Sequence, residues 1–325
     1  YLIGPIMCTN VQGGPAPAGL PYTWKTTAED GSTYSIDKLL LDFALEYQAG
    51  QRVLDGVGSL VWVEFSHWTT HKMGAFRDQF TFALEGGRSF WLGVGLNGPS
   101  GVNTRRARLE FNPNKVGETR ALRWVYNLLY DNSQHTDFPP VVVVRWDFAV
   151  DLPGERTGYE LVKDGRLYEE FRRSASDRTQ YVGRRNAPGR CKLYNKTIEA
   201  GLGLDVTRLE LTLAGDACTV PDVLAVWPRV LRLPDVQQLG GEWLGLNETD
   251  RFILRTLWQQ PGRLGELSRR KREKLEPLVA AGGEVKLDAA AFGRCLVALR
   301  GWLRRRRDDG PPVYGGAWEV VEDVR

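Results

Sequence analysis

The stretch VVVVRWDFAVDLP, residues 141–153, decides the fold class because a continuous apolar run changes here into strict alternation. Successive side chains of a β-strand point to opposite faces of a sheet. The alternation therefore separates a charged face from an apolar face: Arg145, Asp147 and Asp151 against Trp146, Phe148 and Val150. The sequence predicts a strand that is buried on one side and carries charges on the other.

Further short runs rich in aromatic and β-branched residues predict more strands on both sides of this one. They are SLVWVEFSHW (59–68), QFTFALEG (79–86), SFWLGVGL (89–96), RRARLEFNPN (105–114), RTQYVG (178–183), RCKLYNK (190–196) and TRLELTLAG (207–215). The turn RRNAPG (184–189) joins two of them. Helical spacing predicts a helix within 117–132, and the mixed stretch 158–173 is also interpreted as helical.

This order of elements predicts an α+β fold with a largely antiparallel sheet and flanking helices. Residues 1–33 are interpreted as an N-terminal tail or linker, because VQGGPAPAGLP lacks apolar periodicity. Residues 34–235 form the predicted main domain. Residues 236–325 form a mostly helical C-terminal region.

Composition narrows the class of protein. The 325 residues are 42% hydrophobic, and the four cysteines form no Cys-x-x-Cys pair, which argues against a disulfide framework or a zinc knuckle. We find no signal-peptide pattern and no apolar run near the roughly 20 residues of a membrane span. The sequence predicts a soluble, cytoplasmic protein in a reducing compartment, with no membrane partner.

The C-terminal region carries a block of positive charge. Residues 263–307 hold thirteen Lys or Arg and five Asp or Glu, although the whole chain has a net charge of only +3. Such a block is typical of a polyanion partner, and a solvated helix face can look the same. Its densest part contains the candidate DNA-binding residues Arg269, Arg270, Lys271, Arg272 and Lys274.

Three predicted strands each place one carboxylate in an apolar setting: Glu110, Asp147 and Glu210. A buried lone carboxylate costs several kcal/mol unless it is paired or binds a metal, so we expect these three to face a common cluster. Oxygen ligands favour Mg²⁺ or Mn²⁺. The alternative is that each carboxylate pairs with its neighbouring arginine, two residues earlier in the sequence. His67 and His71 have helical metal-site spacing but lie in strand-type sequence, so packing is the better interpretation.

The motifs RLEFNPNK (108–115), RWDFAVD (145–151), YVGRRN (181–186), KLYNKTIE (192–199) and TRLELTL (207–213) follow one another in this order. Together they resemble the replication-initiator family of rolling-circle plasmids of the staphylococcal type, also called trans-acting replication relaxases. The resemblance covers residues 100–215 and extends loosely to 263–278. The chain departs from the family at Asn186-Ala187-Pro188, where relatives often have a serine.

The resemblance implies that Tyr194, in the Tyr-Asn-Lys motif, is the DNA-nicking nucleophile. It implies a divalent metal held by Glu110, Asp147 and Glu210, with Asp151 and Glu199 as further candidates. Lys196 would assist the tyrosine, and Arg184 and Arg185 across the turn would bind the phosphate.

The implied function is initiation of rolling-circle plasmid replication. The protein would bind the double-strand origin and nick one strand to give a 5′-phosphotyrosyl link and a free 3′-hydroxyl, and would later rejoin the strand. The implied partners are origin DNA, a host helicase and a second copy of the chain. One alternative is a relaxase that nicks the transfer origin of a conjugative element. A DNA-binding regulator without chemistry is another.

Overall fold

The computed structural model describes residues 25–117, 119–133, 141–215, 219–233, 245–259, 261–280 and 283–304. The chain divides into two units that are discontinuous in sequence. The first contains residues 1–42, 110–117 and 142–300, and the second contains 43–109, 118–141 and 301–325. The sequence-based boundaries near residues 33 and 235 stay a prediction, and residues 1–24 of the predicted tail lie outside the described residues.

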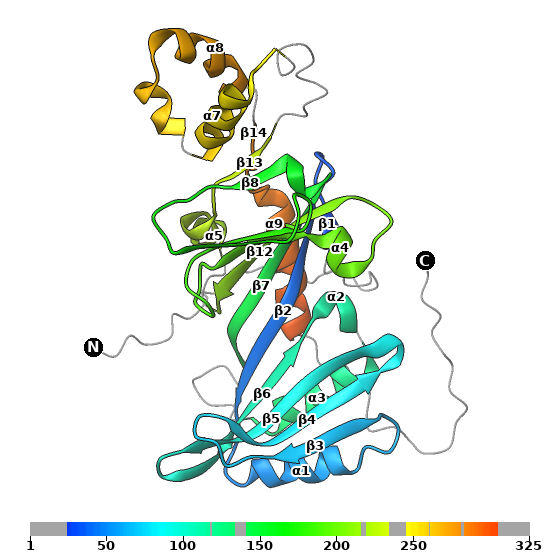
Figure 1. The fold of residues 1–325 in the computed structure, drawn as a ribbon. Coiled ribbons are helices and arrows are strands. Elements are labelled where there is room, and N and C mark those ends of the chain that lie inside the picture. The colour runs from blue at the N-terminus through cyan, green and yellow to red at the C-terminus, as the bar shows by residue number, and fades with distance from the viewer. Residues whose placement is uncertain are drawn as a thin grey trace. The chain divides into compact units, whose positions relative to one another are not determined.

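The first unit is built on a sheet whose strands are hydrogen-bonded in the order β2-β7-β12-β11-β10-β9, with β1 paired to β2 (Figure 1). These strands are β1 (Lys25–Thr27), β2 (Thr33–Ala44), β7 (Val141–Pro153), β9 (Tyr168–Arg172), β10 (Arg178–Val182), β11 (Cys191–Asn195) and β12 (Val206–Ala214). The pairings from β7 through β9 are antiparallel. The α+β class with a large antiparallel sheet is confirmed.

Helix α9 (Ala289–Arg304) supplies the core on one face of this sheet. The ring of Phe292 stands edge-on to Phe148 with centroids 4.9 Å apart, and it stacks near Trp146 at 5.9 Å. Tyr34 of β2 adds a third aromatic contact to Phe148 at 5.8 Å. Trp146 and Phe148 belong to the apolar face that the alternation in 141–153 predicts. The opposite face of β7 is thereby left for the charged residues.

Short elements connect these strands. They are α2 (Pro113–Val116), η2 (Arg156–Gly158), α4 (Lys196–Ala200) and α5 (Val220–Val226). Asn195 begins α4 by accepting a hydrogen bond from the backbone N–H of Ile198, as an N-cap residue does. Helix α4 therefore starts directly after Asn195, the last residue of β11, so Tyr194 lies one residue before the end of the strand.

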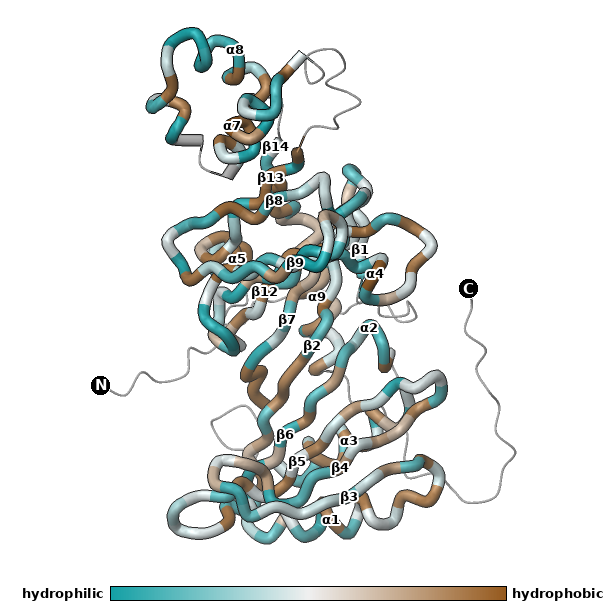
Figure 2. Tube along the Cα trace, in the orientation of Figure 1, coloured by the Kyte–Doolittle hydropathy of each residue, from teal (hydrophilic) through white to brown (hydrophobic). Residues whose placement is uncertain are grey.

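A small sheet with the order β14-β13-β8 carries the C-terminal helices of the first unit. Its elements are β8 (Tyr159–Leu161), β13 (Val230–Arg232), β14 (Gly283–Glu284), α7 (Glu248–Gln259), η3 (Pro261–Glu266) and α8 (Arg269–Ala280). Leu254 and Trp258 of α7 pack with Leu275 and Leu278 of α8 in one buried cluster. Most other residues of α8 are hydrophilic (Figure 2).

The second unit contains the antiparallel strands β3 (Phe65–Thr69), β4 (Phe76–Leu84) and β5 (Arg88–Gly98), the short η1 (Glu85–Gly87), and most of β6 (Gly101–Phe111), with helices α1 (Ala49–Gly58) and α3 (Arg120–Asp131). The α3 helix confirms the helical spacing predicted within 117–132. Helix α1 was not expected from the sequence. A Cβ on its Gly50 would lie 2.5 Å from the carbonyl oxygen of Thr104, so glycine is required for this close approach.

The helix predicted for residues 158–173 is wrong. This stretch forms η2, β8 and β9 instead. Tyr159, Glu160 and Leu161 pair with β13, and Gly165 then takes a φ of +88°, a left-handed conformation that interrupts a helix. The predicted strand at 59–68 is also shorter than expected, because β3 begins only at Phe65. Within the described residues, no helix combines the length and apolarity that crossing a membrane requires.

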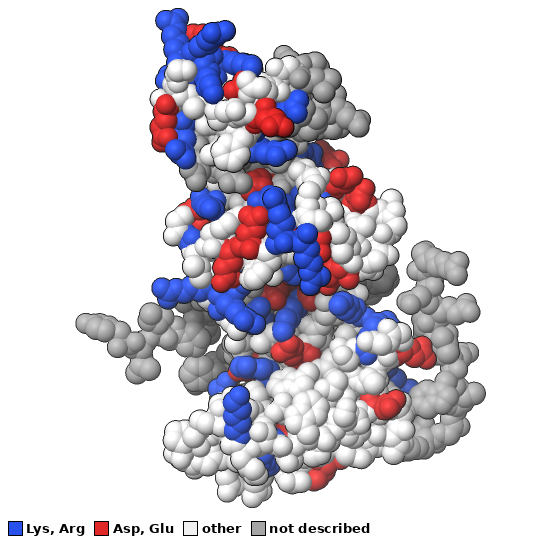
Figure 3. Space-filling model, viewed as in Figure 1, with Lys and Arg blue, Asp and Glu red and all other residues white. Residues whose placement is uncertain are grey.

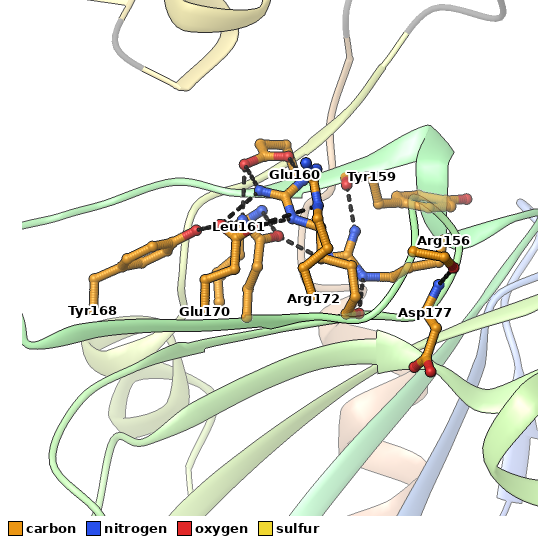
Figure 4. Close-up of polar contacts among 11 residues, drawn as sticks. Arg156, Tyr159, Glu160, Leu161, Tyr168, Glu170, Arg172 and Asp177 are labelled. Carbon is orange, nitrogen blue, oxygen red and sulfur yellow. Dashed lines mark hydrogen bonds and ion pairs between the residues drawn. The ribbon is translucent and has the colours of Figure 1, made fainter.

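A buried polar network holds the β9–β10 hairpin in place (Figure 4). Arg178 donates to both oxygens of Glu160 at 2.5 and 2.8 Å and also bonds Glu170. Gln180 donates to Glu160 at 2.7 Å and accepts a hydrogen bond from Arg156 at 2.5 Å. Because these hydrogen bonds link side chains of β8, β9 and β10, they hold the hairpin Tyr168–Val182 against β8.

We expect Arg178→Met to destabilise the protein by about 3–5 kcal/mol, because it leaves the Glu160 carboxylate buried without its cation. The side chain of Glu160 is only 5% exposed. The matched control is Arg172→Met, since Arg172 is 57% exposed and lies 3.7 Å from Glu170. An exposed pair of this kind contributes about 0–1 kcal/mol. Urea unfolding measures both variants, and equal losses of stability would contradict the proposed importance of the network.

Candidate active site

The polar face of the first sheet gathers charged side chains from four neighbouring strands. The antiparallel register places Tyr194 of β11 opposite Arg208 of β12, and Arg208 opposite Asp151 of β7. One row further along, Lys192 lies opposite Glu210. These rows result from the alternation already visible in the sequence, because each strand turns every second residue to this face.

Tyr194 and Glu210 form the closest contact of this face. The Tyr194 hydroxyl donates a hydrogen bond to Oε1 of Glu210 at 2.5 Å. Tyr194 is only 4% exposed, and burial together with the charge of Glu210 raises the pKa of its phenol above the ordinary value. Burial also raises the pKa of the Glu210 carboxyl. The phenol is therefore neutral at physiological pH, and its proton points at a carboxylate with increased proton affinity.

Two ammonium groups lie beside the Tyr194 ring. The Nζ of Lys192 is 3.6 Å from the ring centroid, and that of Lys196 is 5.9 Å away. Lys192 also approaches Glu210 at 3.9 Å, while Lys196 forms an ion pair with Glu199 on α4. Positive charge at this distance favours the ionised form of a phenol over the neutral form. The two ammonium groups would therefore lower the cost of forming a phenolate in this buried position.

Arg208 fixes the sheet on the other side of Tyr194. Its guanidinium bonds both oxygens of Asp151 at 2.5 and 2.7 Å and reaches Asp37 of β2 at 3.2 Å. Asp37 in turn accepts a hydrogen bond from Asn112 at 3.1 Å. The network ties β2, β7 and β12 together next to the tyrosine, so Arg208 and its two carboxylates position the site.

A groove of about 460 Å³ opens on this face beside Glu210. It is lined by Arg145, Asp147, Glu169, Phe171, Tyr181, Arg185, Asn186, Arg190, Lys192, Glu210 and Thr212. Tyr194 does not line it, but two of its neighbours, Lys192 and Glu210, do. A ligand in the groove would therefore lie against the groups that surround the tyrosine hydroxyl.

The loop between β10 and β11 brings Arg185, Asn186 and Arg190 to the groove. Gly183 has a φ of +98°, and a Cβ there would lie 3.0 Å from the Cα of Arg190, so the turn requires glycine. Asn186 also has positive φ, at +59°, a conformation that asparagine tolerates better than most residues. The loop presents Arg185 and Asn186 to the groove, whereas Arg184 is exposed and does not line it.

The three carboxylates predicted to bind a metal have different partners. Glu110 forms an ion pair with Lys38, and Asp147 forms two hydrogen bonds to Arg145 at 3.0 and 3.1 Å. Asp147 and Glu210 line the same groove, and Glu110 does not. No group of three or more His, Cys, Asp or Glu that could hold a metal ion occurs among the described residues. The described donors thus form no preassembled metal site, and the metal assignment stays a prediction.

His67 stacks on the ring of Phe80 with centroids 4.4 Å apart. It also lies 3.4 Å from Asp78. This placement agrees with the packing interpretation of the histidine pair.

The predicted DNA-binding residues of the basic block lie on α8, where Figure 3 shows Lys and Arg gathered. They fall into two groups. Lys271 and Lys274 both contact Asp250 of α7, at 3.4 and 2.8 Å, and the hydrogen bond from Lys274 lowers the pKa of Asp250. Arg269, Arg270 and Arg272 are exposed; Arg269 forms an ion pair with Glu273 on the same helix, and Arg272 bonds the carbonyl oxygen of Gly265 at 3.2 Å. The two lysines therefore anchor α8 to α7, and the three arginines form its charged outer surface. Of the basic block 263–307, residues 281, 282 and 305–307 lie outside the described residues.

Sequence reasoning missed several residues of the site. Asp37 lies in SIDKLLL, an apolar strand with one carboxylate, which is the same signal that identified Glu110, Asp147 and Glu210. Lys192 lies two residues before Tyr194 and therefore on the same face of the strand. Phe171 gave no signal, because its segment was interpreted as helical.

Comparison with known proteins gives little further information. No model of a protein family matches the chain, and no curated protein matches it. Among solved structures, the chain is similar to a rolling circle replication initiator protein from Geobacillus stearothermophilus, at 14% identity and a TM-score of 0.36. The match covers 70% of this chain and 85% of that one. Because the likeness is this low, the function argued below rests on the residues of the chain itself.

Proposed function

We propose that the protein nicks and rejoins one strand of DNA by tyrosine transesterification. The observation that carries the proposal is the hydrogen bond from the Tyr194 hydroxyl to Glu210, at 2.5 Å, with the Lys192 and Lys196 ammoniums beside the ring. A tyrosine needs a base to act as a nucleophile at neutral pH. Glu210 is in position to be that base.

In the proposed step the phenol oxygen of Tyr194 attacks a phosphodiester phosphorus while Glu210 takes the phenol proton. The bond between phosphorus and the 3′-oxygen breaks, and that oxygen acquires a proton from solvent to become a free 3′-hydroxyl. The 5′-phosphate is left bonded to Tyr194. Because the phosphotyrosyl bond retains the energy of the broken linkage, the reverse attack by a 3′-hydroxyl rejoins the strand without a nucleotide cofactor.

The groove is suited to a single DNA strand. Arg145, Arg185, Arg190 and Lys192 provide four cations along it, close to the Glu210 side of Tyr194. Arginine and lysine bind phosphate oxygens through charge-assisted hydrogen bonds. Among the described residues Arg185 takes part in no ion pair, so its charge is available for phosphate. Arg184 stays a candidate for phosphate outside the groove.

The biological role that we propose is initiation of rolling-circle plasmid replication. The order of the five sequence motifs supports it, and the motif residues Asp147, Tyr181, Tyr194 and Glu210 lie on neighbouring strands of one sheet. The alternative role is that of a relaxase that nicks the transfer origin of a conjugative element. A host helicase and a second copy of the chain are the proposed partners.

A divalent cation, Mg²⁺ or Mn²⁺, is part of the proposal through the family resemblance. When bound, such an ion would neutralise charge on the phosphate. Asp147, which also bonds Arg145, is the groove carboxylate that would hold it while Glu210 takes the proton; Asp151 is engaged by Arg208 and Glu199 by Lys196. The proposed proton transfer itself involves only the side chains of Tyr194 and Glu210.

The test of the proposed function is relaxation of a supercoiled plasmid that carries a candidate origin. We expect relaxed circles and a covalent protein–DNA adduct in the presence of Mg²⁺ or Mn²⁺, and loss of both in excess chelator. An undiminished rate in chelator would remove the metal from the proposal and leave the tyrosine chemistry standing. Absence of nicking on every origin and metal tried would contradict the function itself.

Helix α8 is the proposed reader of the duplex origin. Its exposed arginines could contact phosphates, and one of them could bond a guanine edge in the major groove. We expect the triple change of Arg269, Arg270 and Arg272 to Ala to weaken binding of origin duplex about tenfold or more, with a shallower salt dependence. Cleavage of a single-stranded oligonucleotide should persist. Fluorescence anisotropy measures the binding.

The matched control for this prediction replaces the same three arginines with Lys, which keeps the charge and removes the bidentate guanidinium. Phosphate contacts alone would survive that exchange, whereas recognition of a base edge would not. Unchanged preference for origin over random duplex in the Ala variant would place origin recognition outside α8.

A further inference from the structure

Two aromatic rings stand together in the groove, on the hairpin at the edge of the sheet. Phe171 of β9 and Tyr181 of β10 are diagonal neighbours across the hairpin, with ring centroids 5.9 Å apart and nearly perpendicular planes. Phe171 is 63% exposed, although it lies on a strand of a sheet that buries its other face. Single exposed aromatics are common, but a pair that lines a cationic groove needs an explanation.

Arg190 supports the second ring. Its guanidinium carbon lies 4.5 Å from the centroid of Tyr181, and one of its nitrogens bonds Glu169 at 3.3 Å. The other terminal nitrogen, Nη1, has no hydrogen-bond partner among the described residues. The Tyr181 ring is thus in contact with the Arg190 guanidinium, whose Nη1 has no partner among the described residues. The neighbouring ring of Phe171 is exposed to solvent.

The chemistry of the groove fits a nucleobase better than a simple anion. Inorganic phosphate needs cations and backbone donors only, and it gains nothing from an exposed phenyl ring. Single-stranded nucleic acid combines regularly spaced phosphates with flat faces that stack on aromatic side chains. The groove offers both kinds of contact, because Arg185 and Lys192 lie in the same lining as the two rings.

We propose that Phe171 and Tyr181 form a stacking platform for an unpaired base of the DNA strand near the phosphate that Tyr194 attacks. This inference rests on the proposed nicking function and gives the groove its substrate class: single-stranded, with at least one base turned out. The bases of a duplex are stacked on each other and cannot reach the platform. The site would therefore select DNA that is extruded or already single-stranded.

The experiment measures binding of a fluorescent single-stranded oligonucleotide to the Tyr194→Phe protein, which cannot consume the ligand. We expect Phe171→Ala to weaken this binding about tenfold, the loss that one stacked base typically gives. Phe171→Trp should retain the affinity, because indole also stacks. Tyr47→Ala is the matched control, since Tyr47 is an aromatic residue that is 77% exposed and does not line the groove.

A second readout reports stacking directly. Oligonucleotides with 2-aminopurine at successive positions should show quenching at one position in the Tyr194→Phe protein and none there in the Phe171→Ala variant of it. Duplex of the same sequence should show neither effect. Equal affinity and equal quenching with and without the Phe171 ring would overturn the platform.

The outcomes separate the two proposals. If the wild-type chain nicks DNA but Phe171→Ala changes neither affinity nor quenching, the nicking function stands and the platform is wrong. If single strands bind through Phe171 but are never cut, the platform stands as a binding site and the nicking function fails.

Discussion

Tyr194→Phe is expected to reduce plasmid nicking and the covalent protein–DNA adduct below detection while leaving duplex binding nearly unchanged. Only the nucleophilic oxygen is lost, and the ring keeps its place because Tyr194 is only 4% exposed within the sheet. Relaxation of supercoiled plasmid measures nicking, and denaturing gels with labelled DNA measure the adduct. No other group replaces a lost nucleophile at that position.

The matched control for this variant is Tyr159→Phe. Tyr159 is 3% exposed, and its hydroxyl donates to the carbonyl oxygen of Pro153 at 2.6 Å, so it also loses a hydrogen-bonded hydroxyl in a buried setting. It should nick at close to the wild-type rate. An adduct of undiminished yield in Tyr194→Phe would rule out Tyr194 as the nucleophile.

Glu210→Gln is expected to slow nicking by about a hundredfold to ten-thousandfold, the range typical of a lost general base. The amide keeps the size of the side chain and can still contact the Tyr194 hydroxyl, but it cannot take the proton. Single-turnover cleavage of an oligonucleotide measures the rate. Glu169→Gln is the matched control, because Glu169 lines the same groove but bonds Arg190 rather than the tyrosine.

The same pair predicts the pH dependence of nicking. Burial raises the pKa of Glu210, so the carboxylate is lost at a higher pH than an ordinary glutamate loses its charge. The nicking rate should therefore be low at pH values below the raised pKa of Glu210 and should increase as the pH rises through it. In Glu210→Gln this acidic limb should disappear. A variant that is slow but keeps the same limb would show that another group is the base.

Alternation along the strands made much of the first sheet predictable. The charged and apolar faces of 141–153 and the face of Arg208, Glu210 and Thr212 follow directly from a period of two. The helix α1 was not predictable in this way, because its glycines disfavour a helix in isolation, and one of them, Gly50, is required by the close approach to Thr104. Propensity was overridden there by tertiary packing.

The partners of the strand carboxylates could be predicted from the sequence only in part. Pairing each strand carboxylate with the arginine two residues earlier describes Arg145 and Asp147 correctly. It fails for Glu210, because Arg208 turns to Asp151 and Asp37 on strands far away in the sequence. Glu210 is thereby left to accept the hydrogen bond of the Tyr194 hydroxyl. A cross-strand partner depends on register, which a single sequence does not specify.

The most direct test of the account is to identify the residue that carries the DNA. A single-stranded oligonucleotide that traps the covalent intermediate would be incubated with the wild-type protein, followed by digestion with trypsin and a nuclease and by mass spectrometry. Cleavage after Lys192 and Lys196 releases the peptide Leu193–Lys196, in which Tyr194 is the sole tyrosine. We predict that the nucleotide mass lies on this peptide, as a 5′-phosphotyrosyl linkage. A nucleotide on any other peptide, or cleavage that leaves no adduct, would contradict the account.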